Sequence, residues 1–475
     1  MKKHYETHVE DTDKLISVAG PILEYKSWYE QYRKLMEEQA QRKYGLYTPT
    51  SEDDDDDFPS IPGMVARYSA LGLTNEQMAE NPVWKDLTGN GHDLQMKNFA
   101  WKEGSGISDI YPDALVFDGV DDYGVCENFP ILTKEKGYTV VALRQWLSPE
   151  TKTINEVLLG NFKNNPIWMS ANLGAFQFEV KYNISKVVQT NSFGFGNNIT
   201  LNNNHLFSYQ ISNSYNGSIL SIGNGNGDGG NFFTVGCGGD QFYSNAAIWE
   251  LVFLDHDATE EELTKIKDYF VKTYPWLFPD QAWTVVGKTN EDEDRATIAN
   301  ITGNGNNLVL SNFGFVEGSG YNEEGEYEGY LVTDGVDDKA VSKQFKFGEN
   351  FTVILDFKFP VKKISYCGFD LSTKVRIQNL QGSGVYVVLK GNKTLIPSNV
   401  VRAVTSEGKV YDENWNEYNI VPGNISSNYT MVNLGFDGSN QFAESATKLA
   451  GIYSSTLSKD DCIKAYNYLQ TLKAK

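Results

Sequence analysis

The chain has 475 residues, a formal net charge of −21 at pH 7 and an apolar fraction of 40%. This length is enough for two or three domains of ordinary size, roughly 100–200 residues each. A nucleic-acid partner requires a positive field that displaces counterions from phosphate, so the charge argues against DNA or RNA. No apolar stretch approaches the ~18 residues of a membrane span, and none follows Met1 as a secretion leader would. We therefore expect no membrane partner and folding in a cytoplasm.

The first 60 residues predict a helical attachment arm followed by an acidic linker. Pro21 suits the first turn of a helix that runs to about Tyr44. Its apolar residues follow alternating steps of three and four, the spacing of a short coiled coil: Ile22, Tyr25, Tyr29, Tyr32 and Met36. A coiled coil this short has only marginal stability by itself in water. We therefore expect this stripe to dock on another copy, a partner protein or the first domain. The acidic run 52–57 repels itself and predicts an extended linker.

The rest of the chain repeats itself. Residues 87–94 (Leu-Thr-Gly-Asn-Gly-His-Asp-Leu) match 301–308, and residues 115–122 (Leu-Val-Phe-Asp-Gly-Val-Asp-Asp) match 331–338. Upstream, Thr-Asn-Glu at 74–76 recurs at 289–291. Because the order and spacing of these motifs are kept, one module has been duplicated. The predicted domains are the arm and linker at 1–60, a first β-sandwich at 61–278 and a second at 279–475.

Within each module the pattern is that of short strands separated by Gly/Asn turns. Apolar and polar residues alternate with a period of two, as in residues 176–182, which predicts strands with one buried face. Each module ends in a strand and a capped helix that carries one apolar stripe, with Thr259 and Ser458 as the helix caps. The expected fold class is mainly β, with two tandem sandwiches or jelly rolls behind an α-helical arm. The join falls near 275–281.

Few residues in the sequence suggest a catalytic or ligand-binding site. Each Asp-Gly-Val-Asp-Asp segment has two interpretations that stay open: a hairpin turn, with glycine at positive φ and aspartate bonded to its own backbone, or a calcium loop of clustered carboxylates. The Thr-Gly-Asn-Gly segments are predicted to be turns. No catalytic, cofactor or metal residues are assigned, because the residues shared by the two modules suit turns and cores rather than catalysis. The scattered cysteines are expected to be reduced and buried: Cys126, Cys237, Cys367 and Cys462.

Three features together resemble the concanavalin A-like, LamG-type lectin and glucanase domains. They are the opening Trp84-x-Asp-Leu-Thr-Gly-Asn-Gly, the block at 115–122 and the closing strand with Ala-Ala-Ile-Trp-Glu at 246–250. The resemblance covers roughly residues 62–275 and 283–473. It implies a two-sheet concanavalin A-like jelly roll of about a dozen strands in each module, and possible ligands among glycans. The calcium and glycan residues of that family are not recognisable in this chain.

The style of the repeats, notably residues 289–305, also resembles virion proteins of the crAss-like tailed phages of gut Bacteroidales. That resemblance implies a head fibre or tail appendage on the virion surface. Its arm would join other virion proteins and form a homodimer or homotrimer, and its two modules would adhere to host-surface or gut glycans. The alternatives are a host-encoded carbohydrate-binding protein and, third, a glycan hydrolase. An enzyme is not expected.

Overall fold

The computed structural model describes residues 58–130, 132, 136–147, 156–160, 177–182, 187–189, 220–224, 233–238, 242–303, 305–359, 365–372, 374–379, 385–425, 429–438 and 441–474. Residues Ser60–Lys475 form one compact unit. The predicted helical arm and acidic run lie outside the described residues. We call the strands and helices from Met64 to Leu277 the first module and those from Gln281 to Gln470 the second.

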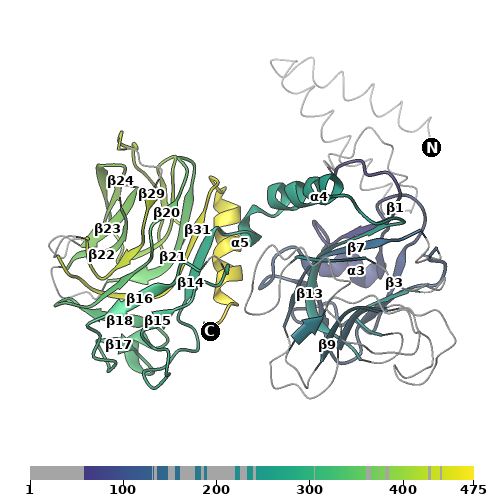
Figure 1. The fold of residues 1–475 in the computed structure, drawn as a ribbon, viewed down its shortest axis with the longest axis horizontal. Helices are drawn as coiled ribbons and strands as arrows, with labels where there is room; N and C mark the ends of the chain where they lie inside the picture. The colour runs from purple at the N-terminus through teal and green to yellow at the C-terminus, as the bar shows by residue number, and fades with distance from the viewer. Residues whose placement is uncertain are drawn as a thin grey trace, which may run out of the picture. The chain divides into compact units, whose positions relative to one another are not determined.

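The prediction of a mainly β fold is confirmed, and the strands pair antiparallel into sheets (Figure 1). In the first module, one sheet has the order β11-β7-β13-β5-β4, with β1 also paired to β13. Its described strands are β1 (Met64–Ser69), β4 (Gly106–Ser108), β5 (Ala114–Asp118), β7 (Thr139–Trp146), β11 (Leu220–Asn224) and β13 (Asn245–Leu254). The other sheet has the order β10-β9-β8-β12-β6-β3-β2. Its described strands are β2 (Val83–Trp84), β3 (Leu94–Lys97), β6 (Tyr123–Cys126), β8 (Glu156–Gly160), β9 (Gln177–Tyr182), β10 (Val187–Gln189) and β12 (Phe233–Val235).

The second module is built in the same way. One sheet has the order β17-β18-β31-β21-β26-β27-β28, with β14 also paired to β31. Its described strands are β14 (Gln281–Thr284), β17 (Gly320–Tyr321), β18 (Leu331–Asp334), β21 (Thr352–Lys358), β26 (Val400–Thr405), β27 (Lys409–Tyr411), β28 (Glu417–Asn419) and β31 (Glu444–Tyr453). The other has the order β15-β16-β19-β30-β22-β23-β24-β25, and β20 pairs with β29 separately. Their described strands are β15 (Thr297–Ile298), β16 (Leu308–Ser311), β19 (Lys339–Val341), β20 (Phe345–Lys346), β22 (Ser365–Leu371), β23 (Val375–Asn379), β24 (Val385–Leu389), β25 (Asn392–Ile396), β29 (Tyr429–Thr430) and β30 (Asn433–Leu434).

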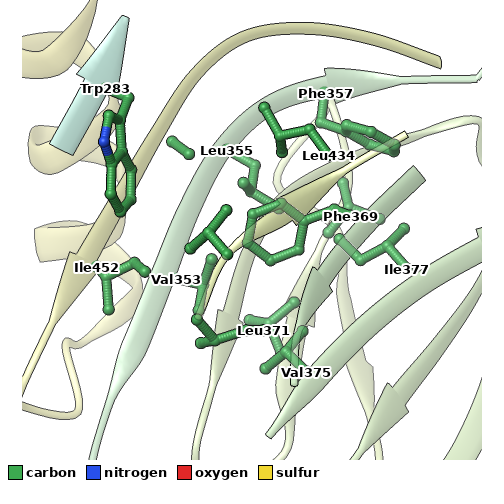
Figure 2. Close-up of a cluster of buried hydrophobic side chains, with 14 of the residues drawn as sticks. Trp283, Val353, Leu355, Phe357, Phe369, Leu371, Val375, Ile377, Leu434 and Ile452 are labelled. Atoms are coloured by element: carbon green, nitrogen blue, oxygen red, sulfur yellow. The ribbon is translucent and has the colours of Figure 1, made fainter. Parts of the chain in front are cut away.

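Each module has its own hydrophobic core. The core of the second module gathers side chains from both of its sheets, among them Phe357 from β21 and Phe369 from β22 (Figure 2). Strands such as β23 and β24 alternate buried and half-buried residues, as period-two sequences predict. The first core is assembled in the same manner, around residues such as Phe253 from β13. This arrangement of two facing sheets around an apolar interior is that of a β-sandwich.

The helices lie outside the sheets. The described helices are α3 (Asn75–Glu80), α4 (Glu260–Thr273) and α5 (Lys459–Gln470), with short 3-10 turns η2 (Pro275–Leu277) and η3 (Gly325–Tyr327). The predicted caps are confirmed: Thr259 and Glu262 form a capping box on α4, and the Ser458 side chain accepts a hydrogen bond from the Asp461 N–H of α5. Helix α5 contacts β21 and β31 of its own sandwich (Figure 1). As predicted, the helices lie on sheets rather than stand free.

An aromatic cluster, the joint, connects the two modules. Trp249 of β13, Trp276 of η2 and Tyr468 of α5 are buried, and their ring centroids lie 5.9–6.5 Å apart in edge-on contact. The Lys464 ammonium of α5 also lies 2.6 Å from the Asp113 carboxylate of the first module. Since β13 packs against its own core on one face and the joint on the other, nearly all its residues are buried, as its almost continuous apolar sequence requires.

Candidate functional site

The residues predicted to mediate attachment lie outside the described part of the chain: Ile22, Tyr25, Tyr29, Tyr32 and Met36. Their role as an oligomerisation stripe therefore stays a prediction. Among the described helices none is long and apolar enough to cross a membrane.

The Asp-Gly-Val-Asp-Asp segment of the first module is a corner between two sheets. It leaves β5 in one sheet and enters β6 in the other, so the expectation of a hairpin is wrong. The local turn chemistry is nevertheless as predicted. Gly119 has a φ of 73°, and one oxygen of Asp118 accepts the Val120 N–H at 2.7 Å. Across the corner, Asp122 Oδ2 accepts the Asp118 N–H at 3.0 Å. Side-chain carboxylates thus replace the strand neighbour that the corner lacks.

The second module repeats this corner between β18 and β19. Gly335 has the same φ of 73°, Asp334 accepts the Val336 N–H at 2.8 Å, and Asp338 Oδ2 accepts the Asp334 N–H at 2.9 Å. The backbone has little room at this point, because a Cβ on Gly335 would lie 2.8 Å from the Glu444 nitrogen. A side chain at that position would therefore be excluded by both space and φ.

One carboxyl oxygen in each corner is buried and has no hydrogen-bond partner within the described part of the chain: Oδ1 of Asp122 and Oδ1 of Asp338. Burial raises the pKa of Asp122 to about 6, which the nearby Ser105 hydroxyl and the Asp118 amide offset only in part. Burial likewise raises the pKa of Asp338 to about 6, against the lowering effects of the Asp334 amide and Ser319. Both carboxyls therefore favour the protonated form more than an exposed aspartate does.

The carboxylates of each corner also lie close enough together to hold a cation. In each group the ligand oxygens lie within 4.8 Å of one another: Asp118, Asp121 and Asp122 in the first module, and Asp334, Asp337 and Asp338 in the second. Calcium takes six to eight oxygens, whereas Asp118 and Asp122 already accept backbone N–H groups. These bonds account for the corner as a structural turn, and the calcium interpretation stays a prediction.

The Thr-Gly-Asn-Gly segments are hairpin loops, as predicted. In the first module the loop joins β2 to β3, and Asp86 Oδ1 accepts from both the Thr88 N–H and the Thr88 hydroxyl. In the second module it joins β15 to β16, and Asn300 accepts the same two bonds from Thr302. Because an amide replaces the carboxylate without loss of these bonds, the acid at Asp86 serves the loop as an acceptor rather than as a charge.

The Thr-Asn-Glu repeat positions a side-chain clamp that the sequence pattern did not reveal. Asn75 accepts the Ile107 N–H and donates to the Ile107 carbonyl, both at 2.8 Å. Asn290 makes the same pair of bonds to Tyr321, at 2.8 and 2.7 Å. The amide group thus mimics a neighbouring strand at the end of β4 and of β17.

Two buried charged networks also escaped the sequence patterns. Arg67 of β1 lies 3.0 Å from Glu250 of β13, and both side chains are almost wholly buried. In the second module, Asp356 receives hydrogen bonds from Tyr330, Tyr466 and Gln470 and pairs with Arg402. Burial alone would raise the pKa of Asp356, but Arg402, Gln470 and Tyr330 lower it below the usual value. Both networks tie strands to helices or neighbouring strands, which is a structural role.

A cavity of about 350 Å³ lies in the first module where the start of β1 meets three loops. Val65, Pro130 and Leu132 contribute apolar wall, and His92, Lys136 and Asp255 contribute polar groups. No spacing rule could have joined these residues, because they lie on loops far apart in sequence. Their meeting depends on the pairing of β1 with β13, which brings both strand ends to one rim.

Of the tryptophans in the described ranges, Trp84, Trp146 and Trp283 belong to the cores, and Trp249 and Trp276 are buried in the joint. Trp101 and Trp415 are half-buried. The four cysteines are free and buried, which confirms that prediction. No known protein family matches the chain, and no curated protein does.

Solved structures with some likeness include Trypanosoma rangeli sialidase, at 9% identity and a TM-score of 0.29, which covers 50% of this chain and 42% of that one. A mutant of a GH54 α-L-arabinofuranosidase, at 14% identity and a TM-score of 0.26, covers 38% of this chain and 51% of that one. The chain thus spans about half or less of either structure. Neither likeness bears on the chemistry of this protein.

Proposed function

We propose that this chain is a virion structural protein, a head fibre or tail appendage of a phage, that displays two lectin-like modules for adhesion to glycans. The non-enzymatic part of the proposal is supported by one observation: the polar residues that the two modules share form hydrogen bonds with the backbone. Asp118 and Asp334, Asp122 and Asp338, and Asn75 and Asn290 are all occupied with backbone N–H or carbonyl groups. This use of the shared residues supports a retained scaffold rather than a retained catalytic site.

The virion part of the proposal is supported by the resemblance of residues 289–305 and by the charge. A net charge of −21 keeps many copies soluble at high local concentration, which suits a protein displayed repeatedly on one particle. The predicted arm would supply attachment to other virion proteins.

Quantitative mass spectrometry of purified particles tests the virion role. The chain should co-purify with particles at a fixed copy number per particle through a density gradient. Its absence from particles that retain infectivity would eliminate the proposal and leave a host-encoded carbohydrate-binding protein as the next candidate.

The adhesive role has a separate test. Purified protein should give glycan-array binding without releasing reducing ends from the bound glycans over long incubation. Release of reducing ends that disappears on substitution of a single carboxylate would instead identify a hydrolase, because glycosidases depend on a pair of carboxyl groups at fixed separation.

The oligomeric role of the arm can be tested by deleting residues 1–57. Light scattering should report a dimer or trimer for the full chain and a monomer for the shortened one, with unchanged circular dichroism in the β region. An oligomer that survives the deletion would contradict the role predicted for Ile22, Tyr25 and Tyr29.

A further inference from the structure

The cavity of the first module is built around a histidine whose position is fixed from both sides. The His92 N–H donates to Asp86 Oδ2 at 3.1 Å, and the His92 carbonyl accepts from the Tyr68 hydroxyl. Its ring packs edge-on against Phe129, with centroids 5.6 Å apart. The backbone and ring are therefore held in place before any ligand arrives, as a binding site requires.

The imidazole of His92 has an unmet hydrogen bond. Its Nδ1 is buried and has no partner among the described residues. A buried polar atom without a partner costs free energy, because it loses its bond to water without a replacement. Since His92 lines the cavity, its ring forms part of the wall against which a ligand would lie.

The other polar groups that line the cavity carry one positive and one negative charge, which cancel. Lys136 contributes an ammonium and Asp255 a carboxylate, and the amide of Asn90 lies on the same wall. Asp255 Oδ1 also lies 3.3 Å from His256 Nδ1. One positive group, one negative group and one amide favour a neutral ligand that both donates and accepts hydrogen bonds, which describes a polyol.

The volume and the apolar surface of the cavity narrow the class of ligand further. A volume of about 350 Å³ is at the lower end of the range for small-molecule sites, roughly 300–1,000 Å³. It suits a single ring. Val65, Pro130 and Leu132 provide an apolar wall for the C–H face of such a ring.

The second module carries different residues at the three polar positions. The repeat aligns His92 with Asn306. Thr139 and Thr352 are equivalent, because each hydroxyl donates to the carbonyl that follows the closing strand by two residues, at His256 and Ser455. This equivalence aligns Asp255 with Ser454 and Lys136 with Glu349. The fold is shared, but the imidazole, the carboxylate and the ammonium are not.

We infer that the first module binds one neutral monosaccharide ring, such as the terminal hexose of a glycan, in the cavity between His92, Lys136 and Asp255, and that the second module does not. This inference rests on the adhesive function proposed above and assigns it to one site. Each chain would then present one sugar site, and the second module would act as a spacer or carry a different ligand.

The test exchanges residues between the modules within the full chain. The variants H92N, D255S and K136E each introduce the residue that the second module has at that position, which its sandwich already accommodates. The matched controls N306H and S454D change the second module. Glucuronate and the methyl glycosides of glucose, galactose and mannose are titrated at millimolar concentration, with the chemical shifts of the protein and its melting temperature as readouts.

Wild-type protein and both controls should bind at least one of the three glycosides with the same affinity. H92N and D255S should each weaken it about tenfold or more, because each replaces a side chain that lines the cavity with a shorter one whose polar atoms lie elsewhere, with cooperative melting retained. Equal affinity in H92N, D255S and wild type would overturn the site. Binding of glucuronate alone would overturn its neutral character, and no binding of any ring would overturn the inference. None of these outcomes affects co-purification with particles, which tests the virion role separately.

Discussion

The amide groups of Asn75 and Asn290 each hold one residue of a neighbouring strand by two hydrogen bonds, to Ile107 and to Tyr321. At the scale of single residues, most of the polar residues that the two modules share form hydrogen bonds of this kind with the backbone. They supply acceptors or donors where the backbone of a corner or loop lacks a strand partner. Residues that differ between the modules, such as His92 and Asn306, are free to carry different functions.

The buried carboxyls of the corners should make stability depend on pH. The folded pKa of Asp122 is about 6, above its ordinary 3.8. Folding therefore favours the protonated form, and this contribution is full below pH ~4 and is lost as the pH rises through about 6. The variant D122N mimics the neutral acid at every pH. It should match wild type near pH 4 and exceed its free energy of unfolding by about 2 kcal/mol at pH 7.

Urea denaturation of wild type and D122N at pH 4, 5, 6 and 7 measures this difference. D338N should behave in the same way, because the pKa of Asp338 is also raised to about 6. An Asn variant that is less stable than wild type at pH 7, together with stabilisation of wild type alone by calcium, would instead favour the cation interpretation of the corners.

The glycines beside the asparagine clamps should not tolerate a side chain. Gly320 has a φ of 151°, and a Cβ there would lie 2.5 Å from Asn290 Oδ1. G320A should therefore break the clamp and lower the free energy of unfolding by about 2 kcal/mol or more. G348A is the matched control, because the nearest atom to its Cβ is 4.0 Å away. Equal melting temperatures for the two variants would show that the clamp is dispensable.

At the scale of elements, much could be predicted from sequence because the signals are local. Period-two alternation in β23 and β24 and the cap at Thr259 depend on neighbours along the chain. The corner at Asp118 was misjudged as a hairpin, because a turn motif does not reveal which sheet the next strand joins. That choice is made by distant pairings, of β5 with β13 and of β6 with β12. The cavity at His92 could not be predicted for the same reason.

The capping box of α4 provides a prediction for one element. Thr259 accepts the Glu262 N–H, and Glu262 accepts the Thr259 N–H in return. T259A removes the first bond and should cost about 1 kcal/mol of stability. T264A changes an exposed threonine within the same helix and should cost less than ~0.5 kcal/mol. Thermal denaturation of the two variants side by side measures the difference, and similar losses would argue against the cap.

At the scale of the whole molecule, two separate cores are connected by one aromatic joint. Trp249 belongs to the first sandwich and Tyr468 to the last helix of the second, with Trp276 between them in the chain. Because these rings are buried, opening the joint exposes apolar surface of both modules. The modules are thus coupled, although their interiors are distinct.

Truncation of a side chain in the joint should therefore lower the stability of both modules. Y468A should lower the free energy of unfolding by about 3 kcal/mol, as loss of a buried aromatic ring does. Hydrogen exchange should quicken in β13 of the first module as well as in α5. K473A, at an exposed position beyond α5, is the control and should leave exchange unchanged. Faster exchange confined to α5 would show that the modules are independent.

The pairing of β1 with β13, and of β14 with β31, has a mechanical consequence. Met64 lies opposite Leu254, and Gln281 lies opposite Ile452, so the first strand of each sandwich begins beside the end of the last strand. Tension applied through the outer ends of these paired strands would break the hydrogen bonds between them one after another, rather than load all of them at once. The first and last strands of each sandwich would then separate at low force.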